Sequence, residues 1–352
     1  MEALIELLRS LPGASGMSDQ TAFIAAAASM ATIMFMVMAL CAIVFTWMER
    51  KVAGFIQNRY GPMRTGRWHG VAQAIADMLK ILSKEDIIPA EADKGLFIFG
   101  PILVLLGSLL AWAAIPWGPN FIAADFDLGL FYIFAVSSMV ILGLLMSGWA
   151  SNNKWALYGA ARGAAQMISY EIPLALATIP VVMYVGSLNT TDIVVAQQGG
   201  IWNWFVFRNP FLFIAFFLYF IASIAETNRG PFDMPETESE LVAGYHTEYT
   251  GMRFAFFFLS EYANLFLVAL IASMVFLGGW WAPIPGLPNV PWLTFVIKGI
   301  LMVFLNMWVR WTLPRVRVDQ LMHLCWKVMI PLSLLCVIGS GIWMMLSGQA
   351  GV

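Results

Sequence analysis

The chain has 352 residues, of which 60% are hydrophobic and only 11% are charged, and its formal net charge is −2. Soluble domains are roughly 45–50% apolar and about 25% charged, so this composition excludes an ordinary soluble domain and indicates an integral membrane protein. The small net charge gives no support to nucleic-acid binding. The three cysteines, Cys41, Cys325 and Cys336, form no CxxC pair and predict no disulfide framework.

The N-terminal stretch EALIELLRSL, which begins at Glu2, predicts a short helix lying on the membrane surface. We expect no cleaved secretory signal at this end. Glu2 and Glu6 interrupt the first residues, and the apolar run that follows continues directly as a membrane span.

Eight apolar segments predict the membrane spans. A helix needs about 20 predominantly apolar residues to cross a bilayer. The segments that meet or nearly meet this length are 22–48, 97–115, 130–149, 164–186, 210–225, 254–278, 292–311 and 328–347. The first is long enough to tilt strongly, and the fifth is short. The sequence therefore predicts an all-α polytopic membrane protein with a single membrane domain over residues 1–352.

The positive residues predict the orientation of these spans. Lys and Arg accumulate on the cytoplasmic side of membrane proteins. All but three of the 19 Lys and Arg fall in the first, third, fifth and seventh connections, and the even-numbered connections hold only Arg208. This alternation places the odd connections inside and both termini outside. Lys298 lies within the seventh span, where snorkelling toward the outer surface and an internal role both stay open.

The first inner connection begins where the apolar run of the first span stops, in WMERKVAGF. There Glu49 and Arg50 either snorkel at the interface or stand at the mouth of an internal cavity. Residues 68–83 then follow a helical pattern, with an apolar face and a polar stripe that holds Asp77 and Lys80. We expect an amphipathic helix on the inner membrane face or against partner subunits, although a plain surface helix fits the pattern equally well.

Two carboxyl groups fall inside predicted spans. Glu171 lies about two turns into the fourth span, and Glu261 lies about two turns into the sixth. An ionised group at the centre of a span costs about 2.5–3.5 kcal/mol on insertion scales, so such residues normally face a cavity or a partner. Phe254 and Phe258 share one helical face with Glu261. That face either lines an amphipathic cavity or meets lipid and core.

An acidic loop over residues 226–253 joins the fifth and sixth spans. It holds six of the 21 acidic residues of the chain, which are Glu226, Asp233, Glu236, Glu238, Glu240 and Glu248. Pro231 and Pro235 keep its first part from forming a simple helix. Confined like charges raise one another's pKa values, so the loop is predicted to accept protons near neutral pH. The basic seventh connection, RWTLPRVRVDQLMHLCWK, is expected to neutralise part of its charge.

The residue types exclude an electron carrier within this chain. His69, His246 and His323 all lie in predicted inner connections, so no pair of mid-span histidines can ligate haem. The scattered cysteines cannot bind an iron–sulfur cluster, and the sequence contains no glycine-rich nucleotide motif. Any electrons must therefore come from a partner.

Several long segments with unusual residue orders resemble sequences of a known family, the NuoH family. Its members are membrane subunits of respiratory complex I, the proton-pumping NADH:quinone oxidoreductase. The segments are ERKVAGFIQNRYGP (49–62), QAIADMLKILSKE (73–85), RGAAQMISYE (162–171), AETNRGPFDMPETESELVAGYHTEY (225–249), SEYAN (260–264) and TLPRVRVDQLMHLCWK (312–327). The sequence departs from the family pattern at Met63 and Met234, where Asn and Leu are usual. The resemblance implies an eight-span protein of the bacterial inner membrane, placed between the membrane and peripheral arms of the complex.

The resemblance also implies site residues. Arg50, Met78, Lys80, Phe254, Phe258 and Arg310 would line a quinone channel that opens to the lipid. The acids Asp77, Glu171, Glu226, Glu236, Glu238, Glu240, Glu248 and Glu261 would form a proton-coupling path toward neighbouring membrane-arm subunits, and Arg229 would pair with them. Ubiquinone or another quinone would be the substrate, while FMN and iron–sulfur clusters would reside in partner subunits. This chain alone would hold no complete active site and no metal.

Three other functions stay open on the residues alone. A homologous membrane subunit of an energy-converting hydrogenase would share the architecture without needing quinone. A self-contained ion transporter would normally show an internal repeat, and no clear repeat occurs in this sequence. A purely structural anchor has no need of intramembrane acids such as Glu171 and Glu261.

Overall fold

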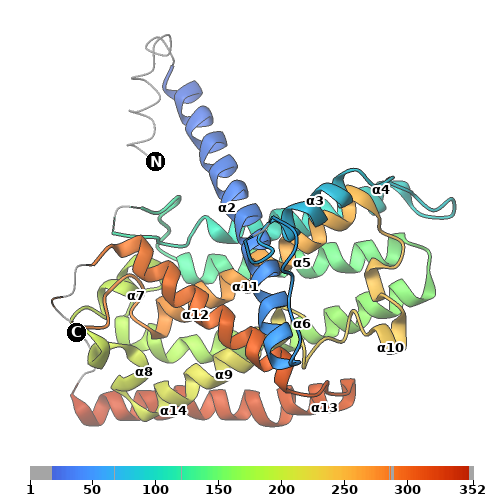
Figure 1. The fold of residues 1–352 in the computed structure, drawn as a ribbon. Helices are drawn as coiled ribbons and strands as arrows, with labels where there is room; N and C mark the ends of the chain where they lie inside the picture. Colours follow the sequence, from blue (N-terminus) through green and yellow to red (C-terminus); the bar gives the residue numbers. More distant parts are fainter. Residues whose placement is uncertain (1–17, 67, 120, 285, 287–288, 349–352) are drawn as a thin grey trace.

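The computed structural model describes residues 18–348, except residues 67, 120, 285, 287 and 288 (Figure 1). The side chains of residues 238 and 239 also lie outside this description. The described residues form helices and no strand, with one isolated β-bridge between Gly118 and Phe121. The predicted all-α class is therefore confirmed for this part of the chain. The surface helix predicted from Glu2 lies outside the described residues.

The helices follow one another without a soluble domain between them. In chain order they are α2 (Asp19–Ile56), α3 (Gln73–Leu82), α4 (Lys94–Trp112), α5 (Gly129–Ala150), α6 (Lys154–Val185), α7 (Thr190–Val195), α8 (Phe205–Arg208), α9 (Pro210–Glu226), α10 (Glu238–Leu241), α11 (Gly251–Phe276), α12 (Pro291–Thr312), α13 (Val318–His323) and α14 (Ile330–Ser347). Short 3₁₀ turns cover Ile201–Asn203 (η1) and Gly244–His246 (η2), and a π-helical turn, Leu324–Met329 (η3), joins α13 to α14.

Seven helical segments of the described chain are long and apolar enough to cross a membrane. They are α2, α4, α5, α6, α11, α12 and the continuous segment Val318–Ser347 that contains α13 and α14. Helix α9 is also apolar but is shorter, with 17 residues. The structure thus supports a polytopic membrane protein, while the count of eight spans and the outward position of both termini stay predictions.

Several helices extend beyond the predicted spans, because hydropathy marks only the apolar part of a helix. Helix α6 begins at Lys154 rather than at residue 164, since the Asn153 side chain caps its first turn by accepting from the Trp155 nitrogen at 2.9 Å. Helix α2 has 38 residues, which gives a length of about 57 Å at 1.5 Å per residue. That length exceeds the roughly 30 Å hydrocarbon core of a bilayer, as the predicted tilt requires.

The amphipathic helix of the first inner connection is α3. It begins at Gln73 rather than at residue 68, because His69 and Gly70 adopt left-handed backbone conformations that a right-handed helix cannot include. Helix α3 packs against the C-terminal half of α2 and the N-terminal half of α11 (Figure 1).

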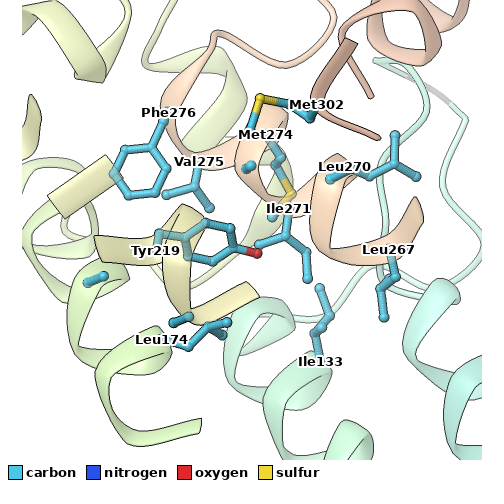
Figure 2. Close-up of a cluster of buried hydrophobic side chains, with 14 of the residues drawn as sticks. Ile133, Leu174, Tyr219, Leu267, Leu270, Ile271, Met274, Val275, Phe276 and Met302 are labelled. Carbon is cyan, nitrogen blue, oxygen red and sulfur yellow. The ribbon is translucent and has the colours of Figure 1, made fainter. Parts of the chain in front are cut away.

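Helix α11 is the centre of the bundle. It packs against α2, α4, α9 and α12, and every residue from Leu265 to Phe276 is buried. Figure 2 shows Tyr219 of α9 among the aliphatic side chains of α11, and its hydroxyl donates to the Val268 carbonyl oxygen at 3.1 Å. A helix that is apolar on all sides belongs in a core. This packing holds the inner half of α11, with its polar and aromatic residues, in a defined position.

Lys298 of α12 does not snorkel. Its side chain is buried, and Nζ donates to the carbonyl oxygens of Leu277 at 2.6 Å, Gly279 at 2.9 Å and Trp281 at 2.7 Å. Nζ also lies 4.1 Å from the centroid of the Trp204 ring. The ammonium group therefore satisfies carbonyl groups at the end of α11, where the helix dipole favours a cation.

We predict that Lys298→Met lowers the free energy of unfolding by about 3 kcal/mol, because three carbonyl groups lose their hydrogen-bond donor at once. Unfolding by SDS in mixed detergent micelles measures this change. Lys327→Met is the matched control, since Lys327 is exposed and should change stability by less than about 0.5 kcal/mol. Equal stability of the two variants would contradict the role of Lys298.

Candidate functional site

The acidic loop folds back against the helix bundle. Gln166 of α6 donates from Nε2 to the carbonyl oxygens of Ala225 at 2.6 Å and Phe232 at 2.7 Å. On the other side, Arg315 in the connection after α12 pairs with Asp233 at 2.8 Å. The loop is therefore held between α6 and the basic connection, which neutralises part of its charge as predicted.

Gly244 lets the second half of the loop return across α6. Its φ is +54°, and a Cβ atom placed there would lie 1.6 Å from the carbonyl oxygen of Pro235. A Cβ atom on Gly159 of α6, if added, would lie 2.7 Å from the Gly244 Cα. Only glycine fits at Gly244, for both conformation and space. Backbone packs directly on backbone here, and this contact sets where η2 presents Tyr245 and His246.

A buried charge cluster connects α2, α11 and α12 to the loop. Arg229 is only 3% exposed, and its Nη1 and Nη2 atoms lie 2.7 Å from Glu49 Oε2 and 3.1 Å from Glu261 Oε1. Arg310 approaches the second oxygen of Glu49, Oε1, at 2.5 Å. The Tyr262 hydroxyl donates to Glu49 Oε2 at 2.8 Å, and its ring lies 4.4 Å from the Arg229 guanidinium carbon. These five residues are the buried charge cluster.

The charges within this cluster balance one another. Burial alone would lower the pKa of Arg229, but the carboxylates of Glu49 and Glu261 raise it above its ordinary value, so the guanidinium stays charged. Two arginines oppose two carboxyl groups, as buried ions in a low-dielectric environment require. Glu49 is therefore an internal residue rather than a snorkelling one. Its neighbour Arg50 is exposed and forms a separate ion pair with Asp77 of α3.

An amphipathic cavity of about 280 Å³ lies between α2, α3 and α11. Five of the six residues predicted to line a quinone channel lie together in its wall, namely Arg50, Met78, Lys80, Phe254 and Phe258. The Arg50–Asp77 ion pair supplies its polar side, and Gln73 supports Asp77 through a 2.9 Å hydrogen bond. The sixth predicted residue, Arg310, lies in the buried charge cluster instead.

A second and smaller cavity lies under the loop. Its volume of about 30 Å³ has room for one or two water molecules. Three of the predicted proton-coupling acids, Glu226, Glu236 and Glu261, lie in its wall together with Asn228. Glu226 Oε2 and Asn228 Oδ1 are buried and make no hydrogen bond within the described part of the chain. This polar cavity therefore offers acceptors to water, and through Glu261 it adjoins the buried charge cluster.

Glu236 is a loop acid whose surroundings favour proton uptake. Burial and the nearby Asp233 carboxylate raise the pKa of Glu236 to about 7. Its Oε1 atom accepts a hydrogen bond from the Tyr245 hydroxyl at 3.2 Å and lies 3.2 Å from His246 Nδ1. Burial lowers the pKa of His246 to about 4, so the imidazole is neutral at pH 7. Glu236 is thus a carboxyl group that exchanges its proton near neutral pH.

Two of the predicted acids anchor the loop at its edges. Glu240 is exposed and pairs with Arg162 of α6 at 2.5 Å. Glu248 accepts a 2.6 Å hydrogen bond from Asn153, the residue that caps α6. Both contacts attach the loop to the first half of α6, and neither side chain lines the polar cavity.

Glu171 lies on α6, apart from the loop, and its carboxylate accepts a hydrogen bond from Ser137 of α5 at 3.5 Å. Glu238 begins the short helix α10, but its side chain lies outside the described residues. Of the predicted acids, the structure therefore brings Glu226, Glu236 and Glu261 into one cavity wall and distributes the others around it.

Three residues of the site carry no strong sequence signal. Tyr245, His246 and Tyr262 are aromatic residues beside acids, a pattern that is more often simple core packing. The sequence allows two interpretations of Glu49, as a snorkelling residue or as an internal one, because a charge at the end of an apolar run usually snorkels. Its true partner, Arg229, is 180 residues away in the sequence.

A further groove is apolar and separate from the site. It has a volume of about 390 Å³ and lies between α2, α12 and the residues after α4, with Trp112, Trp117 and Trp292 in its wall. Its described lining residues include no charged side chain that could orient a polar head group. No cluster of three or more potential metal ligands occurs among the described residues.

Comparisons with known proteins give a consistent result. The chain matches the NADH dehydrogenase family model over residues 29–340. It is 50% identical over 308 residues to the H subunit of NADH-quinone oxidoreductase from Chlorobaculum tepidum, covering 84% of this chain and 86% of that protein. It is 45% identical over 320 residues to the protein of the same name from Anaeromyxobacter dehalogenans, covering 85% and 77%. The corresponding Geobacillus protein is 51% identical over 290 residues, covering 82% and 84%.

We predict that Arg229→Met lowers the free energy of unfolding by about 3–5 kcal/mol, because it leaves Glu49 and Glu261 buried with one cation fewer. Arg162→Met is the matched control, since Arg162 pairs with a carboxylate at the surface and should cost at most about 1 kcal/mol. SDS unfolding curves of both variants provide the comparison. Equal stability of the two variants would contradict the prediction that Arg229 stabilises the fold through the buried charge cluster.

The titration of Glu236 provides a further prediction. Because its pKa is raised to about 7, the carboxyl should be protonated at pH 5.5 and ionised at pH 8.5. Infrared difference spectra between these pH values should show a protonated-carboxyl band that disappears as the pH rises. The band should be weaker in Glu236→Gln and unchanged in Asp127→Asn, which removes an exposed carboxyl. An unchanged spectrum in Glu236→Gln would contradict the prediction.

Proposed function

The chain belongs to the NADH dehydrogenase family, and from this membership we propose that it serves as the H-type membrane subunit of a bacterial NADH-quinone oxidoreductase. In this role it receives quinone from the lipid and couples quinone reduction to proton translocation. The electrons come from FMN and iron–sulfur clusters in partner subunits, and the partners include peripheral quinone-module subunits and neighbouring membrane-arm subunits.

The amphipathic cavity supports the quinone part of this proposal. A quinone combines a polar head group with an apolar tail, and the cavity combines an ion pair with aromatic and aliphatic walls. Phe254 and Phe258 offer flat apolar surfaces to the tail, while Arg50 and Lys80 offer donors to carbonyl oxygens as the head group passes. We propose that quinone travels through this cavity toward its reduction site in a partner subunit.

The proposed coupling of quinone reduction to proton translocation rests on a single observation, the position of Glu261. Its carboxyl group pairs with Arg229 in the buried charge cluster and also lies in the wall of the polar cavity. A change of charge in the cluster therefore acts directly on the group that faces Glu226 and Glu236. Reduction of quinone to quinol takes up two protons and changes the local charge, which shifts the protonation of such a group.

The proton-coupling residues then divide by position. Glu226, Glu236 and Glu261 exchange protons across the polar cavity, and Arg229 sets the charge that they experience. Glu171 continues the path beyond the cavity, toward the neighbouring membrane-arm subunits. Asp77, Glu238, Glu240 and Glu248 complete the acidic path at the mouth of the amphipathic cavity and along the loop. Relatives named as NADH-quinone oxidoreductase subunits favour this function over a hydrogenase subunit or a self-contained transporter.

Photo-crosslinking tests the quinone proposal. A photoreactive quinone analogue added to the assembled complex should label peptides of α2, α3 and α11. Phe258→Trp should reduce this labelling by about tenfold, because the larger ring narrows a cavity of about 280 Å³. Phe304→Trp, which enlarges an exposed ring of α12, should leave it unchanged. Labelling confined to the apolar groove beside α12 would overturn the assignment.

Substitution of Glu261 tests the coupling proposal. In the assembled complex, Glu261→Gln should lower quinone reduction coupled to proton translocation by at least about tenfold, because the residue can no longer exchange a proton. NADH oxidation by an artificial acceptor that bypasses quinone should continue, which shows that the complex is intact. Asp127→Asn serves as the control, with normal coupled activity. Full coupled activity of Glu261→Gln would refute the proton path.

A further inference from the structure

His246 lies between the two cavities. Its ring packs edge-to-face on Phe254 of α11, with 5.3 Å between the ring centroids, and Phe254 lines the amphipathic cavity. On its other side, His246 Nδ1 lies 3.2 Å from Oε1 of Glu236, which lines the polar cavity. One side chain therefore touches a wall residue of each cavity.

Aromatic rings hold the imidazole in place. The ring centroids of Tyr245 and Phe257 lie 3.9 Å and 5.2 Å from that of His246, in addition to the contact with Phe254. The side chain of His246 is only 11% exposed. The turn η2, which contains His246, packs directly on Gly159 of α6. Because Gly159 has no side chain, no rotamer change there can make room for η2 to move. The imidazole is thus held with Nδ1 3.2 Å from Oε1 of Glu236.

Two side chains approach one carboxylate oxygen of Glu236. Oε1 of Glu236 accepts from the Tyr245 hydroxyl at 3.2 Å, and His246 Nδ1 approaches the same atom. The other imidazole nitrogen, Nε2, is buried with no hydrogen-bond partner in the described part of the chain. A proton on Nδ1 leaves only a lone pair at Nε2, whereas the opposite tautomer would bury an unpaired N–H group. The geometry therefore favours donation from Nδ1 to Glu236.

The charges around His246 do not alter this assignment. Glu236, Glu261 and Asp233 are the acids that face the imidazole, and they favour its protonation. Burial opposes them more strongly and lowers the pKa of His246 to about 4. The imidazole therefore acts on Glu236 as a neutral hydrogen-bond donor and not as a cation. Hydrogen bonds to a carboxylate favour its ionised form.

We propose that His246 is a positioning residue that holds the carboxylate of Glu236 in the polar cavity and sets the pH at which Glu236 takes up a proton. Where it concerns coupled activity, the inference rests on the proposed function. The contact between His246 and Glu236 and the titration of Glu236 do not depend on that function.

Two substitutions in the assembled complex test this proposal. His246→Phe keeps an aromatic ring in the cage but removes Nδ1. His246→Asn restores a nitrogen donor, because the amide nitrogen of Asn is bonded to Cγ as Nδ1 is in His. Infrared titration should place the midpoint of Glu236 about one pH unit higher in the Phe variant and near the wild-type value in the Asn variant. His323→Phe, which removes an exposed imidazole, should leave the midpoint unchanged.

The pH profile of coupled quinone reduction completes the test. It should shift upward with the Glu236 midpoint in His246→Phe and return in His246→Asn. An unshifted midpoint in His246→Phe overturns the role of His246, and the proposed function still stands if Glu261→Gln has lost coupled activity. A shifted midpoint with an unshifted activity profile confirms that His246 sets the titration, and contradicts the proton role of Glu236. Loss of assembly in both His246 variants would show a structural role and overturn the proposal.

Discussion

The structure depends on a buried arginine that must be neutralised inside an apolar bundle. Arg229 has almost no contact with solvent, so its charge is tolerable only because Glu49 and Glu261 stand on either side of it. These partners belong to α2 and α11, and Arg310 brings in α12. One electrostatic requirement therefore determines how three helices and the acidic loop are placed.

The two cavities differ in the kind of chemistry that their walls allow. The larger one has aromatic and aliphatic walls with an ion pair at one side, which suits an amphipathic molecule. The smaller one has carboxyl and amide groups and space for little more than water, which suits proton exchange. The buried charge cluster shares Glu261 with the smaller one, and His246 contacts a wall residue of each. Such contacts allow a charge change in one cavity to act on the other without passage of the molecule itself.

The sequence predicts the helices and the class of the site better than it predicts the contacts. Apolar length identifies α4, α5, α9 and α12 to within a few residues. The spacing of Phe254, Phe258 and Glu261 leaves a cavity and a lipid or core contact equally open, and in the structure the two Phe side chains line one cavity while Glu261 lines the other. The beginning of α6 is not predictable from hydropathy, since its first turns are polar and depend on a cap at Asn153. The pairing of Glu49 with Arg229 depends on tertiary approach, and no local pattern encodes it. His246 is inconspicuous in the sequence because its importance lies in the rings and the carboxyl that surround it.

The contact between Gly244 and Gly159 has a mechanical consequence. Side chains can rotate to absorb a small movement, but at this contact backbone rests on backbone with no side chain between. The loop consequently cannot slide along α6, and it can only lift away or travel with the helix as a rigid unit. Gln166 and Asn153 fasten the loop to the same helix on either side of this point. A movement of the loop that begins at its carboxyl groups would therefore also move α6. Because α6 packs against α5 and α14, these helices would be affected too.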